Sequence, residues 1–241
     1  MKKKSHATLA VLVGTLLLMA VPTCYFIAEQ NNPNDPKNLN EYMGLAVADT
    51  GQTLCYDDSG SSIACDENPS NYPRQDGFYA NKPSARSFTG PTQHPTYTSD
   101  YTTKDNVTGL VWKTCAEGLT GSSCNVGAAT AFIWENALNA CESLNSLHGG
   151  AGYANINSWR LPTVSELASI LNYGAEDPAI DSVHFPGTPK FITAKVSFWS
   201  STTRKYFPGS AWFVNFCWAY IAADAKVGSG NYNARCVADN N

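Results

Sequence analysis

Seven cysteines follow a basic and then apolar start of this chain, and these features together limit its fold more than any other. Lys2, Lys3 and Lys4 precede residues 7–28, which carry no charge. This arrangement is typical of an export signal or a membrane anchor, and 22 residues are enough to cross a bilayer. Because cysteines outside the cytoplasm usually form disulfides, we expect an exported, disulfide-stapled chain.

The sequence leaves three alternatives for the N-terminal segment and its attachment to the membrane. Residues 7–28 can remain as a membrane anchor, Cys24 can carry a lipid, or a signal peptide can be cleaved. Cys24 follows Val21-Pro22-Thr23, which resembles a lipoprotein signal only loosely. All three place the remainder of the chain in the cell envelope or on its surface, with the lysines inside.

The charge of the exported part excludes a nucleic-acid partner. It keeps 13 Lys and Arg (16 less the three N-terminal lysines) against all 20 Asp and Glu, a net charge near −7. A basic footprint for nucleic acid is therefore absent. The cysteines show neither a C-x2-C nor a C-x4-C spacing, and there are only four histidines. We therefore expect no metal site and no cofactor.

The sequence divides into an anchor at residues 1–28, a polar tether at 29–49 and a folded part at 50–241. The tether is rich in Asn and Pro. In the folded part, Cys55 and Cys65 flank a turn and predict a small hairpin closed by a disulfide. Cys115 and Cys124 enclose a loop that a second disulfide would close. Residues 70–105 predict short extended pieces at most.

Two helices and several strands predict an α+β domain. The first helix spans residues 130–147, because apolar side chains recur on one face, and His148-Gly149-Gly150 ends it. The second begins after Pro162, where Thr163 and Glu166 have the spacing of a capping box. Strands are expected at 110–112, 198–201, 211–216 and at the C-terminal end. Five tryptophans are expected to pack in the core or under loops, namely Trp112, Trp134, Trp159, Trp199 and Trp212.

Six motifs in a fixed order carry a resemblance to a known family. They are DNVTGLVW from residue 105, the helix around 137–141, WRLPT with the following Glu166-Leu167, FWSST from 198, AWFVNF from 211 and RCV from 235. This series resembles the Lcl C-terminal domain family of exported bacterial proteins over roughly residues 50–238. The family is related in shape to C-type lectins and to the formylglycine-generating-enzyme fold.

The resemblance implies a C-type-lectin-like fold with two helices, short antiparallel strands and long loops. It also implies a disulfide between a helix cysteine and a last-strand cysteine, which here are Cys141 and Cys236. Cys115–Cys124 and Cys55–Cys65 are then the local pairs, and Cys217 remains alone.

The last third of such folds carries the ligand face, so residues 217–233 are expected to form an exposed excursion held by Cys236. The basic turn at 204–206 is the second part of this face. In certain surface proteins of this fold, retroelement-driven mutagenesis diversifies C-terminal residues, and the assortment here looks similar. The candidate ligand-binding residues are Arg204, Lys205, Tyr206, Cys217, Trp218, Tyr220, Asp224, Asn231, Tyr232 and Asn233.

These observations predict an envelope-anchored, lectin-like or adhesin-like protein that binds a protein or carbohydrate and is not an enzyme. One alternative is a structural envelope component that packs against neighbouring subunits. Another is an oxidoreductase of the formylglycine-generating type that uses Cys217. No G-x-S-x-G motif accompanies the serines at 200–201, and Arg160 is expected to be a structural clamp.

Overall fold

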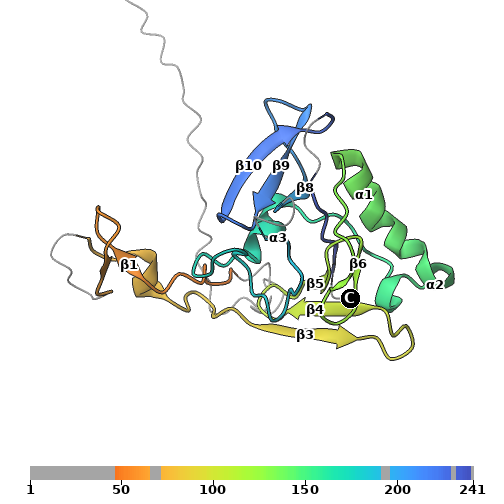
Figure 1. The fold of residues 1–241 in the computed structure, drawn as a ribbon, viewed down its shortest axis with the longest axis horizontal. Coiled ribbons are helices and arrows are strands. Elements are labelled where there is room, and N and C mark those ends of the chain that lie inside the picture. Colours follow the sequence, from red (N-terminus) through yellow and green to blue (C-terminus); the bar gives the residue numbers. More distant parts are fainter. Residues whose placement is uncertain (1–46, 66–71, 191–195, 229–231, 240–241) are drawn as a thin grey trace, which may run out of the picture. The chain divides into compact units, whose positions relative to one another are not determined.

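The structure, a computed structural model, describes residues 47–65, 72–190, 196–228 and 232–239 (Figure 1). The expected anchor, Cys24, most of the tether and Asn231 lie outside these residues. The described part is α+β, with few helices and several small antiparallel sheets. None of its helices is long and apolar enough to cross a membrane.

A four-stranded antiparallel sheet contains the predicted strand around Trp112. Its order is β11-β5-β4-β3, and its strands are β3 (Phe88–Gln93), β4 (Tyr101–Asp105), β5 (Val111–Lys113) and β11 (Val237–Ala238). β3 and β4 correct the expectation of only short extended pieces at 70–105. They pair through residues of low hydropathy such as Thr89 and Lys104, so their sequence lacks the usual strand signal.

A three-stranded antiparallel sheet of order β10-β9-β8 carries the C-terminal third (Figure 1). Its strands are β8 (Ser197–Thr203), β9 (Ser210–Asn215) and β10 (Tyr220–Ala225). β10 pairs with β9 along its whole length, from Tyr220 opposite Asn215 to Ala225 opposite Ser210. The expected excursion at 217–233 is therefore corrected, because most of its first half is an edge strand and not a loop.

The helices are shorter than the sequence predicts. α1 (Trp134–Ser143) is followed by the turns η2 (Leu144–Ser146) and α2 (Leu147–Gly150). The first residues of the expected helix are extended instead, because Phe132 forms a bridge with Tyr232. His148 and Gly149 have positive φ, so the chain leaves the helix at the expected place. Two other short 3-10 turns are η1 (Asp76–Tyr79) and η3 (Tyr153–Asn155).

The capping box predicted for the second helix is present at α3 (Val164–Ser169). Thr163 Oγ1 accepts from the Glu166 N–H at 3.2 Å, and the Glu166 carboxylate accepts from the Thr163 N–H at 2.7 Å. Arg160 donates to both carboxylate oxygens of Glu166, at 2.7 and 2.8 Å. Arg160 therefore acts as the structural clamp that the sequence analysis expects.

Three disulfides link distant and local parts of the described chain. Cys55–Cys65 closes the hairpin of β1 (Cys55–Tyr56) and β2 (Ser62–Ile63). Cys115–Cys124 joins the chain ahead of β6 (Leu119–Thr120) to the turn between β6 and β7 (Val126–Gly127). The third, Cys141–Cys236, joins α1 to the residue before β11. These are the pairs that the resemblance implies, and Cys217 is the remaining free cysteine among the described residues.

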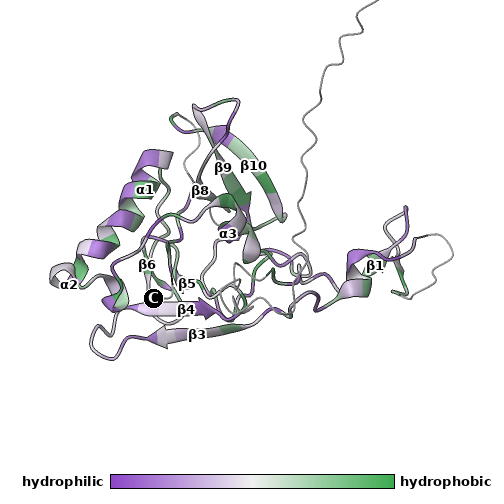
Figure 2. Cartoon of the chain, turned by 180° about the vertical axis from the view of Figure 1, so that it is seen from behind, coloured by the Kyte–Doolittle hydropathy of each residue, from purple (hydrophilic) through white to green (hydrophobic). Residues whose placement is uncertain are grey.

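Two hydrophobic clusters fill the interior between the sheets and helices. One joins Trp112 to α3 and to Phe198, and the other joins Trp159 and Trp199 to the Cys141–Cys236 disulfide. Hydrophobic colour marks β9 and β10, whereas much of α1 is polar (Figure 2). Trp134 and Trp212 are half-buried, and Trp134 packs against the second cluster.

Candidate ligand-binding surface

Two groups of the predicted site residues lie at opposite ends of β9. Residues 204–206 lie in the turn before β9, and Cys217 and Trp218 lie in the turn after it. Six strand residues span about 20 Å at roughly 3.4 Å per residue. The structure therefore does not bring the two groups together into one site.

Two of the predicted residues are corrected because their side chains are buried. Cys217 is 7% exposed and Asn233 is 2% exposed. Asn233 donates to the Ser197 carbonyl oxygen at 3.2 Å, and the Cys217 N–H donates to Asn215 Oδ1 at 2.9 Å. Asn233 therefore positions the sheet, and little of the Cys217 side chain is accessible to a ligand.

Tyr232 and Asp224 form an internal brace against β10. The Tyr232 hydroxyl donates to Asp224 Oδ2 at 2.8 Å, and its ring lies 4.6 Å from Phe213 and 4.7 Å from Trp199 between centroids. Burial and the nearby Asp224 carboxylate raise the pKa of Tyr232. The pair fixes the edge strand to the core.

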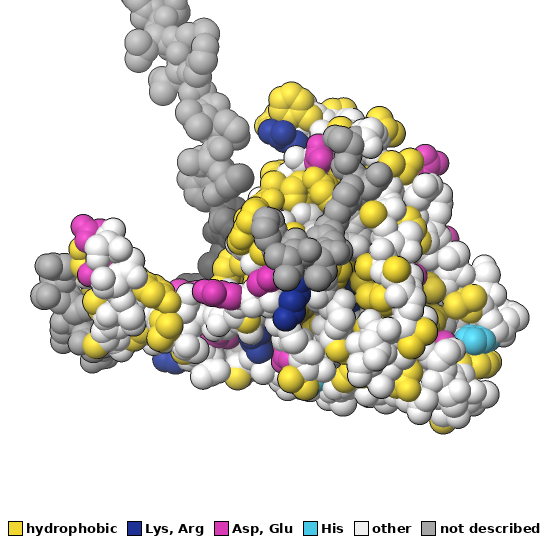
Figure 3. Space-filling view, viewed as in Figure 1, with side chains coloured by type: hydrophobic (Ala, Val, Ile, Leu, Met, Phe, Trp, Pro, Cys, Tyr) yellow, Lys and Arg dark blue, Asp and Glu magenta, His cyan; other side chains and the backbone are white. Residues whose placement is uncertain are grey.

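The turn before β9 forms an exposed basic tip, made of Arg204, Lys205, Tyr206 and Phe207. Tyr206 is 83% exposed and Phe207 is 57% exposed. The Arg204 guanidinium lies 4.3 Å from the Phe207 ring centroid, an arrangement that favours a cation over an aromatic face. Figure 3 shows hydrophobic side chains beside Lys or Arg at the top of the molecule, over this end of the sheet.

The turn after β9 borders an acidic hollow of about 540 Å³. Trp218, which is 62% exposed, and Tyr173, which is 44% exposed, are its aromatic residues. Among the described residues, its lining contains two carboxylates and neither Lys nor Arg. The lining consists of Tyr173, Ala175, Glu176, Asp177, Cys217, Trp218 and Ala219.

Backbone hydrogen bonds hold both sides of the acidic hollow in place. The Ala179 N–H donates to the Phe216 carbonyl oxygen, which joins the loop after α3 to the end of β9. The Tyr173 N–H donates to the Thr50 carbonyl oxygen at 2.9 Å. The Trp218 N–H donates to Asn215 Oδ1 at 2.9 Å, and its ring lies 21° from parallel with Tyr220. The two loops that carry Tyr173 and Trp218 are therefore held in place on both sides of the hollow.

Cys217 lines the acidic hollow without being an activated thiol. Burial and the neighbouring Asp177 carboxylate raise its pKa above the ordinary value. A reactive cysteine instead needs a lowered pKa and an electropositive environment. The thiol therefore stays protonated at neutral pH, and this geometry gives no support to thiol chemistry.

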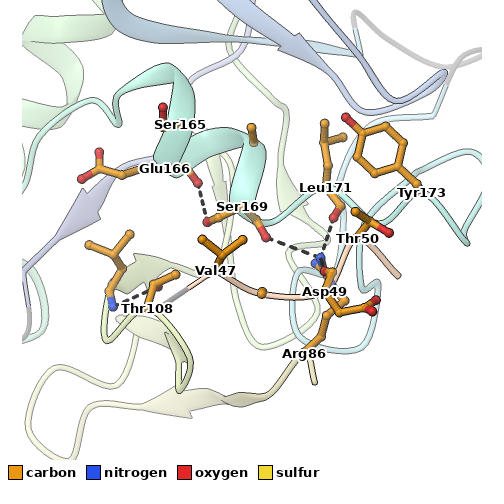
Figure 4. A pocket seen from close by; sticks show the side chains of 13 residues that line it. Val47, Asp49, Thr50, Arg86, Thr108, Ser165, Glu166, Ser169, Leu171 and Tyr173 are labelled. Carbon is orange, nitrogen blue, oxygen red and sulfur yellow. Dashed lines mark hydrogen bonds between the residues drawn. The ribbon is translucent and has the colours of Figure 1, made fainter. Parts of the chain in front are cut away.

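A second hollow of about 530 Å³, with a mainly apolar lining, lies beside Tyr173 (Figure 4). Val47, Leu110 and Leu171 line it, and Tyr173 belongs to the linings of both hollows. Arg86 also lines this hollow. Its guanidinium donates to the carbonyl oxygens of Leu171 at 2.6 Å and of Ile170 at 3.1 Å. The guanidinium of Arg86 therefore satisfies the carbonyl oxygens that follow α3.

A comparison with family models matches residues 101–238 to the Lcl C-terminal domain. The chain belongs to the Lcl C-terminal domain family. A comparison with curated proteins finds no match. The Lcl C-terminal domain contains the basic tip and the whole lining of the acidic hollow, whereas Val47 and Arg86 of the apolar hollow precede the matched range.

Sequence reasoning missed Tyr173, Glu176 and Asp177 as possible site residues of the Lcl C-terminal domain. They follow α3 in an irregular stretch without periodicity, so no pattern singles them out. Phe207 was also missed, although it adjoins the predicted basic turn. An aromatic residue followed by two acids is the one local signal that could have drawn attention to the loop.

Proposed function

We propose that this chain is an exported, envelope-anchored surface protein that binds a protein or carbohydrate through a C-type-lectin-like domain. The observation that carries the proposal is the exposed indole of Trp218 beside the acidic hollow. Exposed Trp and Tyr side chains supply a large contact area, because each combines an apolar ring with a polar N–H or O–H group. Trp and Tyr are also enriched among the residues that dominate binding energy.

The rigidity of the surface supports a role in recognition. Trp218 lies in a turn whose N–H groups at 217 and 218 both donate to Asn215 Oδ1, and the Cys141–Cys236 disulfide holds the chain that returns past this sheet. A preorganised surface loses little conformational freedom when it binds. Loops on a rigid scaffold commonly perform recognition.

The chemistry of the hollow favours neutral or cationic ligands. Glu176 and Asp177 accept hydrogen bonds from hydroxyl or ammonium groups and repel anions. The flat faces of Trp218 and Tyr173 suit apolar faces, aromatic rings and cations.

The disulfides support the proposed export, since six of the seven described cysteines are paired and such bonds persist in oxidising compartments.

We propose membrane attachment through residues 7–28 or a lipidated Cys24, which a mass spectrum of the mature N-terminus would distinguish. Retroelement diversification of the C-terminal residues would require a near-copy of the gene's 3′ end beside a reverse transcriptase.

Replacing the exposed aromatic pair tests the proposed function. Cells that display the Trp218→Ala/Tyr220→Ala variant should bind immobilised glycans or protein-coated surfaces at least ten-fold less than wild type. Tyr56→Ala is the matched control, because Tyr56 is as exposed as Tyr220 but lies in the N-terminal hairpin. Undiminished binding by the double variant, with all three disulfides formed, would contradict the proposal.

A further inference from the structure

The two ends of β9 carry opposite charges beside exposed aromatic side chains. The basic tip contains Arg204 and Lys205, and the acidic hollow contains Glu176 and Asp177. We propose that the basic tip of one copy of this chain inserts into the acidic hollow of a second copy. This inference rests on the proposed function, because it names a partner for the same aromatic surface.

The basic tip has the form of an inserting group. Residues 203–209 are all exposed, so the tip stands clear of the sheet. The Arg204 N–H donates to the Ser210 carbonyl oxygen at 2.9 Å, and the Ser210 N–H donates to the Phe207 carbonyl oxygen at 2.8 Å. These bonds fix the turn before it meets a partner, which reduces the entropy lost on binding.

The acidic hollow has the complementary form and charge. A volume of about 540 Å³ lies in the range of about 300–1,000 Å³ that is usual for ligand pockets. Its carboxylates attract the cations of the tip, while Trp218 and Tyr173 offer aromatic faces to Tyr206 and Phe207. Insertion would also bury the apolar area that Tyr206 and Phe207 expose to water.

The position of the two surfaces makes this contact intermolecular. The tip precedes β9 and the hollow borders its far end, so about 20 Å of strand separates them. A copy cannot place its own tip in its own hollow. Head-to-tail contacts of this kind expose a tip at one end of the assembly and a hollow at the other, and they generate rings or filaments.

Two charge variants test the proposal when they are studied separately and then mixed. The tip variant is Arg204→Glu/Lys205→Glu, and the hollow variant is Glu176→Lys. The full chain in mild detergent is followed by sedimentation velocity over a range of concentrations. Wild type should pass from monomers to dimers and longer assemblies, and each variant alone should need at least ten-fold higher concentrations to associate.

The equimolar mixture of the two variants is the decisive measurement. The intact tip of the hollow variant then meets the intact hollow of the tip variant, so native interfaces form and the mixture should associate at concentrations at which each variant alone stays monomeric. Glu142→Lys, which changes an exposed acid on α1 in the same way, should associate like wild type. All proteins must show the same disulfides and near-ultraviolet circular dichroism.

Three results would overturn the inference: monomeric wild type at every concentration, undiminished association of either variant alone, or a mixture that forms no dimers. The proposed function can survive each of them. If Trp218→Ala/Tyr220→Ala still abolishes binding to another protein or glycan, the surface recognises a ligand but not a second copy.

Discussion

Cys141 and Cys236 form a disulfide across 95 positions of sequence, and both side chains are fully buried. A crosslink that closes such a long loop restricts the unfolded chain strongly. Replacing both cysteines with alanine should lower the free energy of unfolding by about 4–5 kcal/mol. Denaturant titration without reductant measures this loss.

The Cys115–Cys124 bond is the matched control for that prediction, because it closes a loop of only 9 positions. The entropic model assigns it about 3 kcal/mol, so Cys115→Ala/Cys124→Ala should be the less damaging change. The reverse order of the two losses would show that chain entropy does not determine their contributions.

The capping hydrogen bond of Thr163 should contribute measurably to stability. Thr163→Ala removes the acceptor for the Glu166 N–H, which typically costs about 1 kcal/mol at a helix N-terminus. Ser165→Ala, two residues further on at an exposed site, should change the free energy of unfolding by less than about 0.5 kcal/mol. Equal effects of the two variants in urea titrations would argue against the capping role.

Stability should fall in acid partly through Glu166. Burial alone would raise its pKa, but hydrogen bonds from Arg160 and Thr163 hold the pKa below the ordinary value of 4.5. A carboxylate with a lowered folded pKa contributes stability above pH 4.5, and that contribution is lost as the pH falls through the folded pKa. Asp181, whose pKa is also lowered, acts in the same direction.

The variant Glu166→Gln isolates this contribution. It should be less stable than wild type at pH 7, and the difference in free energy of unfolding should shrink as the pH approaches 3. Urea titrations at several pH values measure the difference. A difference that stays constant over this range would mean that Glu166 does not titrate with folding.

The thiol of Cys217 should react slowly in the native protein. Its burial and raised pKa both keep it from the thiolate form that reacts with iodoacetamide. At pH 8, labelling should be at least ten-fold slower in native than in urea-unfolded protein. The Cys217→Ser variant measures the background labelling of Cys24. Rapid labelling of the native protein above that background would instead support the oxidoreductase alternative.

Local signals made α3 and the central strands predictable from the sequence. The spacing of Thr163 and Glu166 predicts a capping box because both partners lie within one turn. Val and Trp are enriched in strands, so Val111 and Trp112 favour a strand. β10 gave no such signal. Its Ala222 and Ala223 have little strand propensity, and they become extended because β9 pairs with them.

The acidic hollow could not be predicted for a related reason. Glu176 and Trp218 are 42 positions apart, and they line one hollow only because the Ala179 N–H donates to the Phe216 carbonyl oxygen. Long-range backbone contacts of this kind leave no periodicity in a single sequence. The burial of Cys217 and Asn233 was missed for the same reason.

The bonds around Arg86 also define where mechanical load enters the domain. Arg86 links the carbonyl oxygens of Asp49 and Leu171, and the Tyr173 N–H links the same loop to Thr50. Force applied to the chain ahead of Val47 therefore reaches the segment that carries Tyr173 as well as Ser84, whose carbonyl oxygen accepts from the Asp49 N–H at 2.8 Å. If the N-terminus is attached to a cell, part of the drag on that cell would reach Tyr173 in the wall of the acidic hollow, and the affinity of this surface for a ligand would then vary with tension.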